Sequence, residues 1–225
     1  MPGSTPVRRS SLRQQIADAL RDEVLTGRLP SGRRFTVKEI ADLYGVSATP
    51  VREALVDLAA QGLLEVEHHR GFQVREFTHA DYRGLVEARI LVTEGIFRRL
   101  TDRGLAAFPP EAMASVRRRA EAAVSAVRAG ALDVLIGCDQ RFWRELALLA
   151  ENSHISEFLE RLRAQSWVFA VPFLRAERDL SQVCWTGHVV LADAIRDGDA
   201  EATRRLVSAY NEHALTLIDR LTDRG

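Results

Sequence analysis

The sequence has few of the features that mark membrane, secreted or disulfide-rich proteins. It contains only two cysteines, Cys138 and Cys184, and no run of about 18 uncharged apolar residues that could span a bilayer. The segment before Leu12 has no apolar stretch of the kind that directs secretion. We therefore expect a cytoplasmic protein whose two thiols are free and buried within helices.

The chain also lacks net charge, and Lys38 is its only lysine. The charge is unevenly divided, because residues 1–75 hold 11 basic and 9 acidic side chains whereas the remainder holds 20 and 22. This weak asymmetry favours a nucleic-acid-binding N-terminal part. The apolar content of 46% is that of an ordinary globular protein.

Three short helices are predicted in the N-terminal part. Ser11 can cap the first helix, and Thr36-Val37-Lys38-Glu39 forms a capping box before the second. Gly45 supplies a tight turn, and Ser47 can cap the third helix. The apolar positions expected to face the core are Leu12, Ile16, Leu20 and Val24 in the first helix, Ile40, Ala41 and Leu43 in the second, and Val51, Ala54, Leu55 and Leu58 in the third.

A two-stranded β-hairpin is predicted after the third helix. Leu64 and Val66, and then Phe72 and Val74, alternate as strand residues do, around a tip that contains His68-His69-Arg70. Two helices joined by a glycine turn and followed by a hairpin form the layout of a winged helix-turn-helix, which places one helix in the DNA major groove. The alternative is a winged module that contacts only other proteins.

Four segments of this part follow a known pattern closely: Leu25–Gly32, Gly45–Leu55, Gly62-Leu63 and Arg70–Val74. Together they resemble the DNA-binding domain of the GntR family of bacterial regulators. The resemblance implies a set of DNA-contacting residues on the second helix, at the start of the third helix and in the wing. These residues are Lys38, Ser47, Ala48, Thr49, Arg52, His69, Arg70 and Gly71.

Ala48 departs from the family pattern, which usually has an arginine at this position. An arginine reads guanine through two hydrogen bonds, a contact that provides about 1–3 kcal/mol of discrimination. Alanine offers only an apolar contact to a thymine methyl group. We therefore expect an operator that lacks a guanine preference opposite Ala48.

Only helical periodicity is visible in the C-terminal part. The apolar positions predict six or seven helices, with breaks at Gly130, near Asn152, near Pro172 and at Gly198. Helices of this length joined by short loops form an antiparallel bundle, so the fold class is mainly α. The predicted organisation is a flexible N-terminus (1–10), a winged helix-turn-helix (11–75), a linker (76–79) and a helical domain (80–225).

Three features of the helical part resemble the FCD domain, the all-helical effector-binding domain of the FadR branch of the GntR family. They are Glu87-Ala88-Arg89, Asp139 with Phe142 and Asn152, and His188 followed by Ala194–Asp199. The resemblance implies that this domain binds a small-molecule effector and holds a homodimer together. The expected effector-binding residues are Arg89, Asp139, Trp143, His188 and Tyr210.

Many FCD domains bind a divalent metal, and the resemblance places its four ligands at Asp139, Trp143, His188 and Tyr210. Tryptophan cannot ligate a metal, and a tyrosine phenol is mostly protonated near neutral pH. His213, three residues after Tyr210, could complete a zinc, nickel or manganese site with Asp139 and His188. The alternative, which we prefer, is a metal-free Asp139–His188 hydrogen bond beside an aromatic pocket that suits an apolar or aromatic effector.

Arg89 is the expected partner of an acidic effector, because its planar guanidinium binds a carboxylate through two hydrogen bonds. The alternative is a surface or intrahelical ion pair with Glu87 or Glu94.

The sequence is therefore interpreted as a cytoplasmic, nucleoid-associated transcription regulator. We expect a repressor that binds a pseudo-palindromic operator as a homodimer and releases it when an organic acid or an apolar metabolite binds. One alternative is a constitutive DNA binder with a vestigial pocket. Another is a metal-dependent helical enzyme that uses Asp139 and His188.

Overall fold

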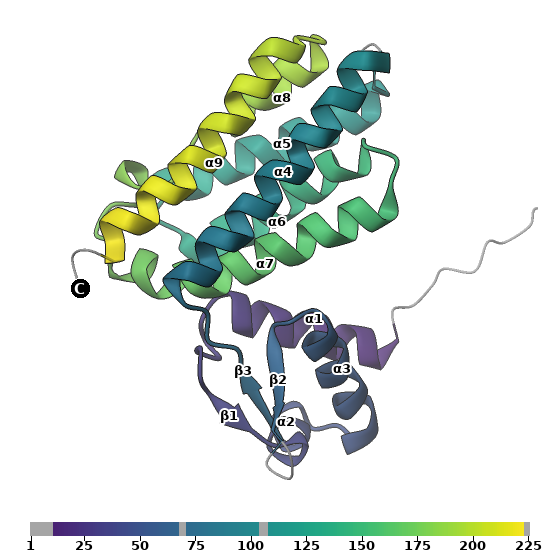
Figure 1. Cartoon of the computed structure of the whole chain (residues 1–225). Coiled ribbons are helices and arrows are strands. Elements are labelled where there is room, and N and C mark those ends of the chain that lie inside the picture. Colours follow the sequence, from purple (N-terminus) through teal and green to yellow (C-terminus); the bar gives the residue numbers. More distant parts are fainter. Residues whose placement is uncertain (1–10, 68–70, 104–107, 223–225) are drawn as a thin grey trace, which may run out of the picture. The chain divides into compact units, whose positions relative to one another are not determined.

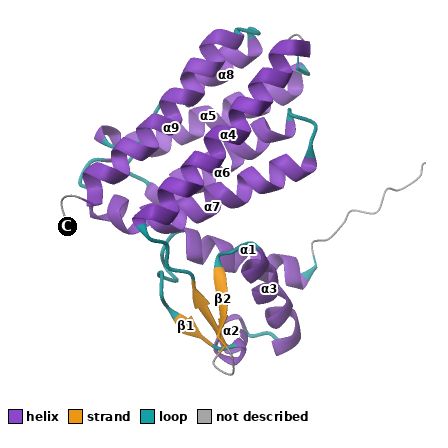
Figure 2. Ribbon diagram, viewed as in Figure 1, coloured by secondary structure: helices purple, strands orange, loops and turns teal. Residues whose placement is uncertain are grey.

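The computed structural model of the protein describes residues 11–67, 71–103 and 108–222. These residues form two compact units, one before Phe77 and one from Phe77 onward, with Leu25–Gly27 assigned to the second. In the described ranges, strands occur only in the first unit and the second is helical (Figure 2). The mainly α fold class is confirmed, whereas the N-terminal segment 1–10 lies outside the described residues.

The first unit, termed here the winged unit, contains helices and a small antiparallel sheet (Figure 1). Its elements are α1 (Leu12–Leu25), β1 (Arg34–Phe35), α2 (Val37–Tyr44), α3 (Ala48–Ala60), β2 (Leu64–Glu67) and β3 (Gly71–Val74). The strand order is β1-β3-β2, with Phe35 opposite Phe72 and Val66 opposite Phe72 on the other side. The sequence did not predict β1, because two residues are too few to show a period.

Gly71 is required by the close approach of β1 to β3. Its φ of 99° lies in the left-handed region, and an added Cβ would lie 2.3 Å from the carbonyl oxygen of Phe35. A side chain at this position would therefore clash with the backbone of β1. This steric requirement holds whether or not Gly71 also contacts DNA.

Local capping was predicted correctly for α2 but not for α3. The side chain of Thr36 accepts a hydrogen bond from the Glu39 backbone, and the Glu39 side chain accepts one from Thr36. Ser47 makes no such bond. Leu43, expected in the core, is 73% exposed because it lies on the opposite side of α2 from the buried Ala41. Leu12, at the start of α1, is also exposed.

The second unit, termed here the helical unit, is a bundle in which α4 lies beside α7 and α9, and α5 beside α6 and α8 (Figure 1). Its elements are α4 (His79–Arg103), α5 (Pro110–Arg128), α6 (Leu132–Leu148), α7 (Ser153–Ala176), the short 3₁₀ helix η1 (Leu180–Gln182), α8 (His188–Arg196) and α9 (Ala200–Thr222). None of the described helices is long and apolar enough to cross a membrane.

Two predicted boundaries in the helical unit are wrong. Helix α7 continues through Pro172 instead of breaking there. Proline removes one helical hydrogen bond, but burial of Val171 and Leu174 on either side holds the last turn in place. No break was predicted between Pro172 and Gly198, but this segment is divided into η1 and α8, and Cys184 lies between them rather than within a helix. Cys138 and Cys184 are both free thiols.

Candidate DNA-binding surface and ligand cavity

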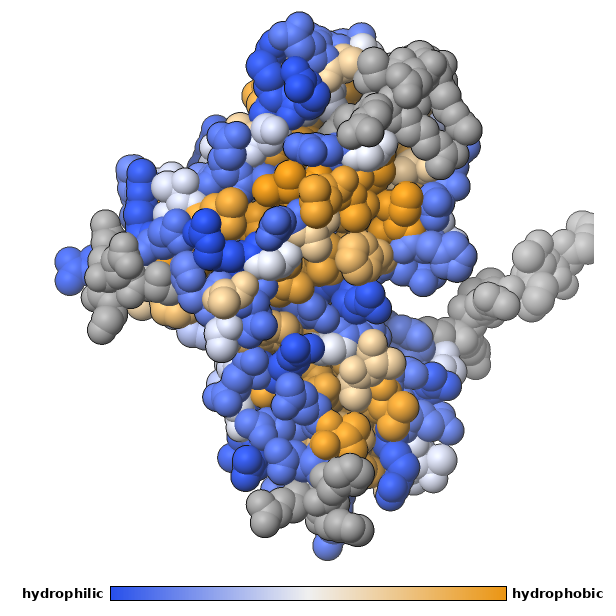
Figure 3. Space-filling view, in the orientation of Figure 1, coloured by the Kyte–Doolittle hydropathy of each residue, from blue (hydrophilic) through white to orange (hydrophobic). Residues whose placement is uncertain are grey.

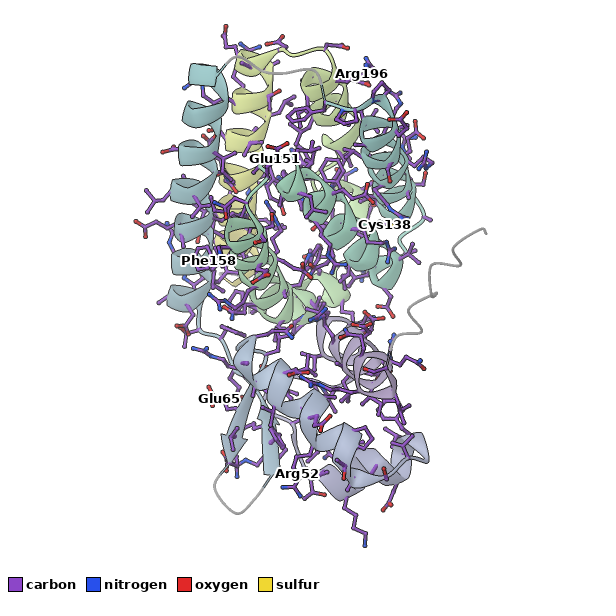
Figure 4. All side chains as sticks on the ribbon, turned by 90° about the vertical axis from the view of Figure 1, so that its right-hand side faces the viewer. Arg52, Glu65, Cys138, Glu151, Phe158 and Arg196 are labelled. Atoms are coloured by element: carbon purple, nitrogen blue, oxygen red, sulfur yellow. The ribbon has the colours of Figure 1, made fainter. Side chains whose placement is uncertain are left out.

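The start of α3 presents an exposed face in the winged unit. Ala48, Thr49 and Arg52 are exposed, and their spacing of three and four residues places them on one side of the helix. The opposite side is fully buried through Val51 and Leu55. Figure 4 shows the Arg52 side chain on α3 at the surface of the winged unit. The first turn of α3 is therefore free to approach DNA.

Lys38 on α2 is exposed, as is Ser47 immediately before α3. Within the described ranges, neither Lys38 nor Arg52 forms an ion pair with a carboxylate, so both cations are available to phosphate groups. His69 and Arg70, the predicted wing contacts, lie outside the described residues.

The helical unit contains a cavity of about 80 Å³, termed here the Arg89 cavity. It is lined from α4, α6, α7, α8 and α9, and four of the five predicted effector residues lie on its wall: Arg89, Asp139, His188 and Tyr210. Trp143, the fifth, stands behind Tyr210, with the two ring centroids 4.5 Å apart. The structure therefore brings together residues that are separated by more than a hundred positions in the sequence.

Asp139 is the buried acid of this cavity, with 3% exposure and three N–H partners. Its Oδ1 accepts a hydrogen bond of 3.0 Å from Nε1 of Trp143 and lies 3.1 Å from Nε2 of His188. Its Oδ2 accepts one of 3.1 Å from Nε1 of Trp167. Burial alone would raise the pKa of Asp139, but the bond and charge of His188, with Arg163 and Trp167, outweigh it and lower the pKa. Asp139 is thus an ionised carboxylate.

This donor set does not fit a divalent metal. An indole nitrogen has no lone pair to offer, and Trp143 and Trp167 both direct their N–H groups at the Asp139 carboxylate. Nε2 of His213 lies 2.9 Å from the carbonyl oxygen of Val183. In the part of the chain that the structure describes, no group of three potential metal ligands comes together.

Two buried arginines, Arg89 and Arg163, line the same cavity as this carboxylate. Nε of Arg89 donates a hydrogen bond of 2.8 Å to Oδ1 of Asn211, whereas its Nη2 is buried without a partner among the described residues. The guanidinium of Arg163 stacks on Trp143 at 4.0 Å, and Nη1 donates to the hydroxyl of Tyr210 at 3.3 Å. Burial lowers the pKa of Arg163 to about 10, so the group stays charged at neutral pH. The Arg89 cavity therefore carries one excess positive charge when its histidines are neutral.

The surface ion pair considered for Arg89 is wrong, because this side chain is only 2% exposed. Sequence reasoning also missed Arg163 and Trp167 as cavity residues. Arg163 lies four residues after the buried Leu159 and three before the buried Ser166, which places it on the buried face of α7. This spacing is the signal in the sequence that could have indicated its burial. Trp167 was not among the predicted effector residues, because nothing in the sequence indicates the partner of its indole N–H.

Comparisons with known proteins agree with both halves of the chain. Residues 12–74 match the model of the bacterial regulatory proteins of the gntR family, and residues 84–213 match the FCD domain. A protein of Paenarthrobacter nicotinovorans, named as a probable D-xylose utilization operon transcriptional repressor, is 31% identical over 208 residues, which cover 92% of this chain and 85% of that protein. The regulator McbR of Escherichia coli is 37% identical over 76 residues, 34% of each chain.

Solved structures share the fold of the whole chain. The structure of E. coli McbR/YncC matches with a TM-score of 0.75 and 22% identity over 96% of this chain and 99% of that one. A GntR regulator from Rhodococcus sp. RHA1 matches with a TM-score of 0.71 and 24% identity over 93% and 98%. The family matches exclude the enzyme considered from the sequence. The chain belongs to the GntR family of bacterial transcription regulators and carries an FCD domain of the FadR-like type.

Proposed function

We propose that this protein is a cytoplasmic, nucleoid-associated repressor that releases its operator when a small organic acid occupies the Arg89 cavity. The observation that carries the choice of an acid is the unpartnered Nη2 of Arg89 in a cavity with excess positive charge. A buried donor without an acceptor costs about 1–3 kcal/mol. A carboxylate ligand recovers this cost and neutralises the cavity.

His188 adds a second requirement for the effector. Its Nε2 faces Asp139, and its Nδ1 is buried without a partner among the described residues. When Nε2 carries the proton, Nδ1 is an acceptor that suits a hydroxyl group of the ligand. Two unmatched polar groups in one cavity argue against a vestigial pocket, in which apolar packing is expected to replace them.

Effector binding in this account needs no metal. The two indole N–H groups and His188 provide hydrogen-bond partners for both oxygens of the Asp139 carboxylate, so no cation is needed to satisfy them. The acid is therefore held by direct ion pairing with Arg89 and not through a bridging cation.

DNA recognition is assigned to the exposed face of α3 and its neighbours. We propose that Lys38 and Arg52 bind phosphate groups, while Ala48 and Thr49 face the base edges. The family resemblance adds Ser47 and the wing residues His69, Arg70 and Gly71. One recognition helix reads only a few base pairs, so a two-fold dimer on a pseudo-palindromic operator doubles the contacts.

An apolar surface on the helical unit supports the homodimer. Figure 3 shows a hydrophobic area over α4 and α7. Leu91 of α4 is 64% exposed, and the side chain of Phe158 on α7 lies on the same side of the helical unit as α4 (Figure 4). An exposed patch of this kind marks an interaction site, and a second copy supplies a self-complementary partner.

Repression is proposed because the relative from P. nicotinovorans is named as a repressor. Its name also offers D-xylose as a candidate effector. D-xylose is a neutral sugar that leaves the excess charge of the Arg89 cavity uncompensated, so we favour an acid. For release to follow, the effector must bind the released state more tightly than the DNA-competent state.

The test begins with selection of a binding site from random DNA and measurement of the mass of the complex. An inverted repeat bound by two chains supports the dimeric operator model, and a single half-site bound by one chain contradicts it. A panel of carboxylates, with D-xylose and other neutral sugars as comparison, is then added to the complex. Release by carboxylates alone supports the proposal. Release by D-xylose alone, or by no compound, contradicts the acid effector.

A further inference from the structure

A second cavity of about 70 Å³ lies in the same bundle and has a different character. This Thr203 cavity is lined by Thr93, Ile96, Phe108, Trp143, Leu146, Ala147, Leu149, Ala150, Leu159, Arg163, Ile195, Thr203 and Val207. Ten of these side chains are apolar. The hydroxyl of Thr203, whose residue is 1% exposed, has no hydrogen-bond partner among the described residues.

The Thr203 cavity follows the Arg89 cavity along the bundle. On α9, Tyr210 lines the Arg89 cavity and Thr203, two helical turns or about 10 Å away, lines the other. On α6 the corresponding pair is Asp139 and Ala147. The same succession occurs on α4 with Arg89 and Thr93 and on α7 with Ser166 and Leu159. Each of these four helices therefore lines the Arg89 cavity at one position and the Thr203 cavity about one or two turns away.

Three stacked side chains form the partition between the cavities. Arg163 lines both. Its guanidinium lies 4.0 Å from the Trp143 ring and 5.4 Å from the Tyr210 ring, and those two rings are 4.5 Å apart. The long side chain of Arg163 can leave this wall by rotation about its bonds, whereas the rings of Trp143 and Tyr210 also pack against Phe142 and Trp185, respectively.

We propose that the two cavities form one binding site for a carboxylate with an apolar tail, with the head at Arg89 and the tail in the Thr203 cavity. This proposal rests on the acid effector proposed above and names its class. The carboxylate head draws Arg163 away from Trp143 to pair with it, because an ion pair between a guanidinium and a carboxylate is stronger than a stack on a ring. The same movement opens the partition for the tail.

The tail chemistry follows from the walls. Apolar walls favour alkyl or aromatic groups, and the Thr203 hydroxyl allows one polar atom near the far end. A tail that reaches Thr203 spans about two helical turns beyond Tyr210, roughly 10 Å. Short acids fill only the Arg89 cavity, so the second cavity selects for chain length.

The test is calorimetric titration of the full-length protein with butanoate, octanoate, decanoate and decanol in buffer that contains a chelator. The proposal predicts that affinity rises about fourfold for each methylene group buried in the Thr203 cavity, and that decanol binds far more weakly than decanoate. Equal affinities for butanoate and decanoate overturn the two-cavity site and leave the acid effector standing. If none of the three acids binds, the two-cavity site is overturned, and the carboxylate panel described above decides separately whether an acid is the effector.

A matched pair of variants locates the tail. Ala147→Leu fills the Thr203 cavity, and Ala170→Leu makes the same change in the wall of the Arg89 cavity. The first is expected to remove the gain with chain length while butanoate binding stays within about twofold, and the second to weaken all the acids. A length dependence that survives Ala147→Leu overturns the placement of the tail. The wild-type series decides the matter if either variant fails to fold.

Discussion

The indole Nε1 of Trp143 donates a hydrogen bond of 3.0 Å to Oδ1 of Asp139, which lies four residues earlier on α6. This spacing places both side chains on one face of the helix. A histidine at position 143 offers a lone pair that can bind a cation together with Asp139, whereas the indole offers only its proton to the carboxylate. The identity of residue 143 therefore helps to decide whether this carboxylate accepts a hydrogen bond from the protein or binds a metal.

We predict that Trp143→His creates a metal site. The new imidazole, Asp139 and His188 supply three ligands for zinc, and a water molecule can take the fourth position. After incubation with zinc and gel filtration, the variant is expected to retain about one zinc per chain by elemental mass spectrometry. The wild-type protein is expected to retain none. Trp185→His, at the tryptophan whose ring stacks on that of Trp143, serves as the control.

Zinc retained by the wild-type protein through Asp139 and His188 contradicts the metal-free account. If the Trp143→His variant also stays free of metal, Trp143→His combined with Trp167→Phe tests whether the hydrogen bond from Trp167 keeps the carboxylate from the metal. Zinc retained by the double variant shows that it does, and a double variant without zinc contradicts the predicted site.

The lowered pKa of Asp139 gives a pH-dependent contribution to stability. The folded pKa lies below the usual value of 3.8, so this contribution is fully present above about pH 4 and is lost as the pH falls through the folded pKa. Asp139→Asn is expected to destabilise the helical unit by about 2 kcal/mol at pH 7. The difference between variant and wild type is expected to shrink below pH 3.8.

The measurement is urea unfolding followed by tryptophan fluorescence, because all three tryptophans belong to the helical unit. A difference that stays constant from pH 7 to pH 3 would show that the charge of Asp139 makes no contribution. Asp133→Asn, an exposed change on the same helix, is the control for surface charge.

Ala48→Arg is predicted to change the operator. The new guanidinium can bind guanine through two hydrogen bonds, with about 1–3 kcal/mol of discrimination over other bases. Sites selected from random DNA are expected to acquire a guanine in each half-site with the variant and to lack it with the wild type. An invariant guanine opposite Ala48 in the wild-type sites contradicts this assignment.

Arg52→Ala is predicted to weaken binding to all DNA sequences alike. Loss of one phosphate contact lowers the slope of log affinity against log salt by about one. The control is Arg13→Ala, since Arg13 pairs with Asp57 in the same winged unit. If the variant loses sequence discrimination and keeps the wild-type salt slope, Arg52 reads a base and not a phosphate.

Sequence reasoning succeeded where structure is determined locally. The capping box of Thr36 and Glu39 and the turn at Gly45 depend on residues within a few positions of one another, and both were predicted. Pro172 shows the limit of such reasoning: its local preference to end a helix is overcome by the burial of Val171 and Leu174, which only the folded bundle reveals.

The cavity was predictable only in part. The resemblance to a known domain indicated Asp139, His188 and Tyr210, whose positions carry over from the family pattern. The arrangement around them depends on long-range packing: Trp167 reaches Asp139 across 28 positions, and Arg163 reaches Tyr210 across 47. No periodicity in the sequence encodes such partners, so the excess positive charge emerged only from the structure.

The central claim is that a carboxylate bound directly at Arg89 controls operator binding. The most direct measurement is fluorescence anisotropy of a labelled operator bound to wild-type protein, titrated with the best-binding acid in the presence of a chelator. The matched variants are Arg89→Met and Arg83→Met, a buried and an exposed arginine of α4. The account predicts release from wild type and Arg83→Met, and no release from Arg89→Met, which still binds the operator. Release of Arg89→Met at the wild-type acid concentration would contradict it.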